Sequence, residues 1–130
     1  MIELNIKTSK KCQMVDISRH LASAILTNKW ENGILTIFIP HTTAAVTINE
    51  NADPDVLSDM TLFLERLVPN EPYFKHYEGN SDAHIKASLF GSSESIIVEN
   101  SRLILGSWQG VYFCEFDGGR ERKIWLKFVG

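Results

Sequence analysis

The sequence contains little cysteine and no long hydrophobic run. Only two cysteines, Cys12 and Cys114, occur in its 130 residues. They are too few and too far apart for a disulfide framework or a four-cysteine metal site, so we expect buried free thiols and a reducing, cytoplasmic compartment. No apolar run approaches the ~20 residues that span a bilayer. The first residues alternate between apolar and polar instead of forming a signal-peptide core.

A strong excess of charge of one sign is also absent. The formal net charge is -3 and the isoelectric point is about 5.8, with no long basic run. Neither nucleic acid nor a membrane is therefore an expected partner. The chain lacks a phosphate-binding glycine loop and a dinucleotide fingerprint, so no organic cofactor is expected. Its 44% hydrophobic content is sufficient for a single domain over residues 1–130.

Hydrophobic periodicity predicts strands that come in blocks, together with three helices. The expected strands cover residues 2–6, 13–15, 34–39, 44–48, 95–99, 102–105, 107–116 and 123–129. The expected helices cover residues 17–28, 54–67 and 83–90, with Ser81 or Asp82 as the cap of the third. Because strands and helices do not alternate regularly, the pattern favours an α+β fold with mostly antiparallel sheets.

Two of these elements carry specific expectations about burial. Residues 34–39 are almost all apolar, which is typical of a central strand buried on both faces. Asp53 is a good helix cap, and Pro54 suits the first helical position. The helix that follows has an apolar stripe that we expect to be core, formed by Val56, Met60, Phe63 and Leu67.

The segment between these two elements has an unusual density of polar chemistry. His41, Thr42 and Thr43 follow a strand, and Asn49, Glu50 and Asn51 lead into the helix. Loops held between rigid elements often carry functional sites, so we expect this segment to form one wall of a site. Capping explains the presence of Asp53, but Glu50 has no such structural role. Glu50 is therefore a candidate for acid–base chemistry or for a place near a bound metal ion.

Three histidines, His41, His76 and His84, lie in loops or at the ends of elements. Three imidazoles around one ion leave a fourth position open, as in catalytic zinc sites. Their spacing matches no compact zinc signature, and the alternative is three separate hydrogen-bonding histidines.

Lys86 near a helix N-terminus suits an anion site. A Ser88–His84 nucleophilic pair is disfavoured, because residues four apart on a helix do not orient the hydroxyl toward the ring.

Two further segments carry candidate binding residues. Arg120 and Arg122 follow a Gly-Gly turn, and their guanidinium groups suit phosphate or carboxylate, the alternative being a solvated hairpin end. Trp108 and Gln109 lie between two glycines at the start of a strand, where a bulge or a close backbone approach is common. Trp108 could instead be core, and Gln109 requires hydrogen-bond partners if it points inward.

Together these segments resemble the YjbQ-like family, known as secondary thiamine-phosphate synthases. The resemblance is carried by residues 41–54 (HTTAAVTINENADP), 78–88 (EGNSDAHIKAS), 102–111 (RLILGSWQGV) and 117–122 (DGGRER). It implies two packed sheets with helices, a homotrimer, and a polar site built from the histidine segments near a subunit interface.

The family reaction joins a pyrimidine pyrophosphate to a thiazole phosphate and releases pyrophosphate. Such chemistry uses a divalent cation and positive groups around the leaving phosphates. Under this resemblance His41, His84 and Glu50 are the catalytic candidates, and a Zn or Mg ion would be held by His41, His76 and His84. The candidates for binding a small phosphorylated molecule are Thr42, Thr43, Asn49, Asn51, Lys86, Ser88, Trp108, Gln109, Arg120 and Arg122. A metal-dependent hydrolase and a non-catalytic module that senses a phosphorylated metabolite are the alternatives.

Overall fold

The computed structural model describes residues 1–130, and its elements follow the order expected from the sequence. The strands are β1 (Ile2–Lys7), β2 (Gln13–Asp16), β3 (Gly33–Phe38), β4 (Ala44–Glu50), β5 (Ser93–Glu99), β6 (Arg102–Leu103), β7 (Gln109–Glu115) and β8 (Glu121–Val129). The helices are α1 (Ser18–Thr27), α2 (Pro54–Leu67) and α3 (Ser81–Phe90).

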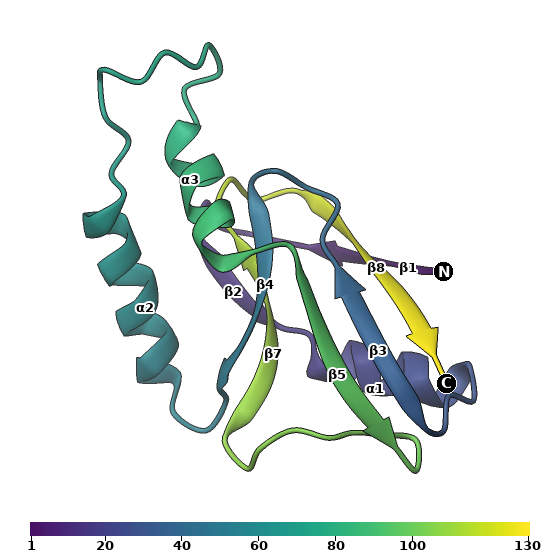
Figure 1. Ribbon diagram of the computed structural model, residues 1–130. Helices are drawn as coiled ribbons and strands as arrows, with labels where there is room; N and C mark the ends of the chain where they lie inside the picture. Colours follow the sequence, from purple (N-terminus) through teal and green to yellow (C-terminus); the bar gives the residue numbers. More distant parts are fainter.

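The strands form two antiparallel sheets (Figure 1). Five strands pair in the order β1-β8-β3-β5-β6, and three pair in the order β2-β7-β4. This arrangement confirms the α+β class with antiparallel sheets. No helix is both long enough and apolar enough to cross a membrane.

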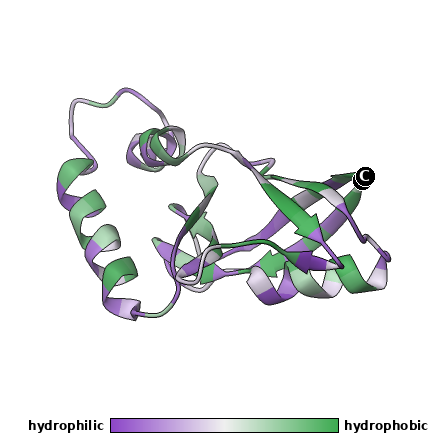
Figure 2. Ribbon diagram, turned by 60° about the horizontal axis from the view of Figure 1, so that its bottom comes forward, coloured by the Kyte–Doolittle hydropathy of each residue, from purple (hydrophilic) through white to green (hydrophobic).

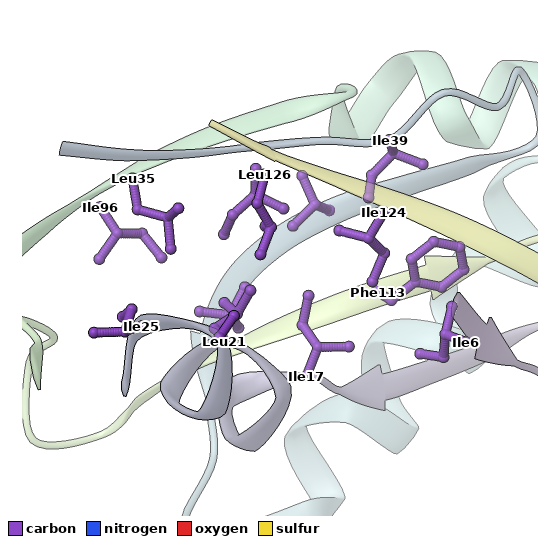
Figure 3. Packing of buried hydrophobic residues seen from close by; sticks show 14 of the residues in the cluster. Ile6, Ile17, Leu21, Ile25, Leu35, Ile39, Ile96, Phe113, Ile124 and Leu126 are labelled. Atoms are coloured by element: carbon purple, nitrogen blue, oxygen red, sulfur yellow. The ribbon is translucent and has the colours of Figure 1, made fainter. Parts of the chain in front are cut away.

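The main core lies between the two sheets and is closed by α1. Ile17, Leu21 and Ile25 from the α1 segment point toward Leu35 of β3 and Phe113 of β7 (Figure 3). All five side chains are fully buried. The carboxylate of Asp16 accepts a hydrogen bond of 2.9 Å from the Ser18 N–H, which fixes the entry into α1.

The expectation that residues 34–39 are buried on both faces is wrong. Leu35 and Ile37 are fully buried, but Ile34 and Phe38 on the other face of β3 are 42% and 41% exposed. Side chains alternate across a strand, and the chain covers only one face of the five-stranded sheet. In contrast, β4 is buried on both faces near its start, because α3 packs on Ala45.

The expectation that the α2 stripe is core is also wrong for a single chain. Asp53 caps the helix as predicted, since its carboxylate accepts a 2.9 Å bond from the Asp55 N–H. Only Leu64 of α2 is buried, whereas Phe63 is 62% and Leu67 56% exposed. α2 stands to one side of the sheets with apolar residues on its surface (Figures 1 and 2).

Several boundaries differ from the sequence expectation. The strand predicted at 102–105 has only two residues, and β7 starts at Gln109, so that residues 104–108 form a connection outside the sheets. Asn100 and Ser101 turn with φ of 50° and 60°, as a tight hairpin requires. Neither Ser81 nor Asp82 caps α3, because Asn80 occupies the cap position and Asp82 is buried.

Candidate functional site

Two adjoining pockets share His41, Thr42 and His84, and together they form what we call the histidine pocket. One has a volume of about 390 Å³ and the other about 470 Å³. The first is lined almost entirely by polar groups: His41, Thr42, Thr43, His76, Glu78, Asn80, His84, Asp117, Arg120 and Arg122, with Pro40. The second adds Ala44, Ala87, Ser88, Gly91 and Ser92.

Strand pairing brings these distant segments together. β3 pairs with β8, and β4 pairs with β7, so that Phe38 lies opposite Trp125 and Ala44 opposite Glu115. The link between β3 and β4 and the turn between β7 and β8 therefore lie at the same end of the two sheets. α3 packs against β4 and brings His84 to this end, and the loop before α3 brings His76.

His41 presents a neutral ring with a single available N–H. Its Nε2 accepts a 2.9 Å hydrogen bond from the backbone N–H of Lys123, so a neutral ring carries its proton on Nδ1. Burial, followed by the positive charge of Arg122, lowers the pKa of His41 below its usual value. The ring is therefore a hydrogen-bond donor at neutral pH, which suits a ligand oxygen.

His84 and His76 lie in contact on the other wall of the pocket. Their ring centroids are 5.2 Å apart and their planes meet at 86°. The hydroxyl of Ser88 donates a 3.0 Å bond to the backbone oxygen of His84, not to the ring. Ser88 therefore lines the pocket without forming a nucleophilic pair with His84, in agreement with the sequence argument.

The two arginines of the pocket differ in what they can offer a ligand. Arg120 is about half exposed and donates a 3.0 Å bond to Asp117, which leaves guanidinium N–H groups available. Arg122 is buried, and it donates to Glu115 and to the hydroxyl of Thr43, the latter at 2.8 Å. Arg120 is thus the available cation, while Arg122 and Thr43 form the wall.

The sequence reasoning missed Glu115, which organises this wall. The carboxylate is fully buried and accepts bonds from Thr8 at 2.7 Å and from the Phe116 and Asp117 N–H groups at 3.1 Å. Burial acts to raise the pKa of Glu115, but these donors and Arg122 hold it below its usual value. A lone carboxylate within the apolar stretch 110–116 was the available signal, since a buried charge requires partners.

The three histidines do not form a metal centre as they are placed. No group of three His, Cys, Asp or Glu side chains lies close enough together to hold an ion. The Nε2 lone pair of His41 is also occupied by the Lys123 N–H. The donor set therefore does not fit the expected ion. The same groups suit a ligand that accepts hydrogen bonds.

Another group of predicted site residues lies at the far end of β4 and β7. Glu50 pairs with Gln109 there, six positions along β4 from the Ala44–Glu115 pair. At ~3.3 Å per residue, this separation is roughly 20 Å. Asn49, Asn51 and Trp108 also belong to this end, and Trp108 is 66% exposed instead of core. One chain therefore does not unite these five residues with the histidine pocket.

Gln109 at that end supports the backbone. Its side-chain oxygen accepts a 2.7 Å bond from the Gly106 N–H, which meets the need for a partner that the sequence suggested.

Lys86 faces away from the histidine pocket. It follows His84 by two residues, which places the two side chains on nearly opposite faces of the helix. Its side chain is only 4% exposed and lies near Asp82 and Cys12. Lys86 lines separate pockets with Cys12, so it does not contact a ligand held by the histidines.

Comparisons with known proteins agree on one family. A family model described as "UPF0047 protein YjbQ-like" matches residues 2–130. A UPF0047 protein of Methanocaldococcus jannaschii is 49% identical over 130 residues, covering 100% of this chain and 94% of the relative. The UPF0047 protein YugU of Bacillus subtilis is also 49% identical, covering 98% of this chain and 97% of the relative.

Solved structures show the same fold. A YjbQ/UPF0047 family protein from Clostridium acetobutylicum superposes with a TM-score of 0.95 at 50% identity, covering 99% of this chain and 100% of that one. A conserved hypothetical protein from Thermus thermophilus gives a TM-score of 0.93 at 37% identity, covering 99% of this chain and 100% of that one.

Proposed function

Since the chain belongs to the YjbQ-like UPF0047 family, we propose that its histidine pocket binds and converts a phosphorylated small molecule. The reaction is the one implied by the family resemblance, the joining of a pyrimidine pyrophosphate to a thiazole phosphate with release of pyrophosphate. The observation that supports this proposal is a polar pocket in which the ring N–H of His41 and the free N–H groups of Arg120 are available to an anion.

The proposed roles follow from charge development. As the bond from carbon to the pyrophosphate oxygen breaks, negative charge builds up on the leaving group. Fixed donors stabilise that charge most strongly in a site with little water. Arg120 and His41 would bind the leaving oxygens, and His84 would donate a proton to the leaving pyrophosphate as the thiazole nitrogen forms the new bond to that carbon. A divalent cation, if required, would arrive bound to the pyrophosphate as part of the substrate.

The test is a direct assay on purified protein with Arg120→Ala and, as a matched control, Arg102→Ala. Arg102 is an exposed arginine on β6 that does not line the histidine pocket. We expect thiamine phosphate and pyrophosphate as products. Loss of one charge-assisted hydrogen bond should raise KM about 10-fold or more in Arg120→Ala and leave Arg102→Ala unchanged.

Three results would contradict parts of this proposal. No turnover and no stabilisation by pyrophosphate would remove the anion pocket. Stabilisation without turnover would leave a sensing module instead of an enzyme. A stoichiometric transition metal in wild-type protein, lost in both His41→Ala and His84→Ala, would favour the metal-dependent hydrolase.

We also propose that the chains assemble, as the trimer that the family resemblance implies. The observation in support is apolar surface without cover in one chain, on α2, on α3 and in the loop between them. Its residues are Leu62, Phe63, Leu67, Tyr73, Tyr77, Ile85 and Leu89, all at least 39% exposed. Apolar surface of this extent commonly marks an interface. An interface here would also allow the residues at the far end of β4 and β7, such as Glu50 and Trp108, to approach the histidine pocket of another copy.

Sedimentation at micromolar concentration is expected to give three times the 14.7 kDa mass of one chain. Phe63→Glu should lower that mass because it places a charge in the apolar surface. Ser58→Glu, at an exposed polar position of the same helix, should not. A wild-type protein of 14.7 kDa would contradict the assembly.

A further inference from the structure

A second cluster of reactive side chains lies behind α3, away from the histidine pocket. Cys12 follows β1 and lies 3.9 Å from Lys86 of α3, measured between Sγ and Nζ. Lys86 is also 3.9 Å from the Asp82 carboxylate, and Lys11 contacts the same carboxylate at 3.1 Å. The cluster joins the turn between β1 and β2 to the helix that carries His84.

Lys86 is unusual because it is buried without a close partner. Its side chain is 4% exposed, yet its polar contacts, the Cys12 thiol and the Asp82 carboxylate, both lie as far away as 3.9 Å. One oxygen of Asp82, itself 2% exposed, has no hydrogen-bond partner. A buried amine of this kind normally requires compensation.

A small molecule can reach the cluster from one side. Cys12, Lys86 and Asp82 line a pocket of about 270 Å³ together with Lys11 and Glu65. Cys12 is partly exposed, in contrast to Cys114, which is fully buried. Exposure to solvent is a requirement for oxidation of a thiol. The other cysteine provides an internal comparison.

We propose that Cys12 and Lys86 form a reversible covalent link under oxidation, with one oxygen atom bridging sulfur and nitrogen. The 3.9 Å gap favours a bridged link over a direct bond, because the bridging oxygen spans part of the distance. The oxidant is a peroxide. Lys86 lies on a helix and Cys12 on a turn, so modest movement of the lysine side chain brings the two together.

The chemistry balances with two molecules of hydrogen peroxide. The Cys12 sulfur attacks the first and becomes a sulfenic acid, releasing water. The second oxidises the Lys86 amine to a hydroxylamine, again releasing water, and Asp82 accepts the proton of the ammonium. The sulfenic acid and hydroxylamine then condense with loss of a third water, forming the S–O–N link. Two equivalents of a dithiol restore the thiol and amine and release the bridging oxygen as water.

The charges around Cys12 set its reactivity. Burial raises the pKa of the Cys12 thiol above its usual value, and Glu65 and Asp82 add to this effect, while Lys86 and Lys11 oppose it. The thiolate is the reactive form. Linkage should therefore become faster as the pH rises.

The experiment is peptide mapping of peroxide-treated wild-type protein, digested with trypsin without reduction. Trypsin no longer cleaves after Lys86 when the lysine nitrogen is part of the link. The expected product joins residues 12–19 to residues 76–102, uncleaved at Lys86. Its mass exceeds the sum of the two peptides by one oxygen less two hydrogens. Oxidation of Met14 alone adds a whole oxygen and does not join peptides.

A dithiol should abolish the joined product. Cys12→Ser and Lys86→Arg should not form it, whereas Cys114→Ser should form it as the wild type does. Two results would overturn the proposal. One is recovery of Cys12 only in unlinked peptides with normal cleavage at Lys86. The other is a joined product that lacks the added oxygen. Both are read on wild-type protein, so the outcome does not depend on a variant that fails to fold.

Discussion

His84→Ala is expected to lower kcat by about 10²–10⁴-fold, the usual contribution of a positioned general acid or base. The ring is half-buried at the rim of the pocket, where it contacts His76 and makes no hydrogen bond or ion pair within the chain. Its removal should therefore leave the fold and the assembly intact. Initial rates of thiamine phosphate formation measure the effect, with thermal unfolding as the check on structure.

His20→Ala is the matched control for that prediction. His20 is an exposed histidine on α1 that does not line the histidine pocket. It should retain wild-type rates. Turnover close to wild type in His84→Ala would remove His84 from the catalytic assignment, whereas a lower thermal stability of that variant would indicate a structural role.

Glu115→Ala is expected to destabilise the protein by about 3–5 kcal/mol, because it leaves Arg122 as a buried charge without its partner. The carboxylate is fully buried and is bonded to Arg122, Thr8 and two backbone N–H groups. Urea unfolding followed by tryptophan fluorescence measures the change. A loss below 1 kcal/mol would show that the pair contributes little.

The double variant Glu115→Leu with Arg122→Met distinguishes the contribution of the ion pair to stability from the contribution of side-chain packing. Apolar groups of similar volume often replace a buried ion pair at little cost. We therefore expect the double variant to be more stable than Glu115→Ala. Glu3→Ala breaks a solvent-exposed pair with Lys123 and should have a much smaller effect than Glu115→Ala.

The same variants have a predicted pH dependence. The pKa of Glu115 in the folded protein lies below the ordinary value of 4.5. The stability that this carboxylate contributes is thus complete above pH 4.5 and is lost as the pH falls through the folded pKa. Wild-type protein should lose more stability than the double variant below pH 4.5. Equal slopes would contradict the assignment.

The sequence by itself determined the order and class of the elements. Alternation in β1 and β8, the Asp53-Pro54 start of α2 and the Gly91 end of α3 are local signals, because they depend on backbone geometry within a few residues. The same local reasoning identified the histidine segments and their resemblance to the family. These features can be predicted without knowing which helices and strands pack against each other.

Burial was decided only by the tertiary structure. The spacing of Phe63 and Leu67 predicts an apolar helix face, but it does not show whether another element packs on that face. Both residues are exposed in the single chain. β3 shows the same limit, since an apolar run does not reveal that only one face is covered.

The composition of the site also depended on the tertiary structure. Some residues that are close in sequence lie apart in the structure. Glu50 is at the opposite end of β4 from His41, and Lys86 is on the opposite face of α3 from His84. The turn between β7 and β8 places Glu115 beside Arg122 across the two sheets, and the pairing of β3 with β8 places the Lys123 backbone beside the distant His41. Sequence reasoning supplied the chemical groups, while the direction of each side chain followed from strand register and helix phase, which long-range packing determines.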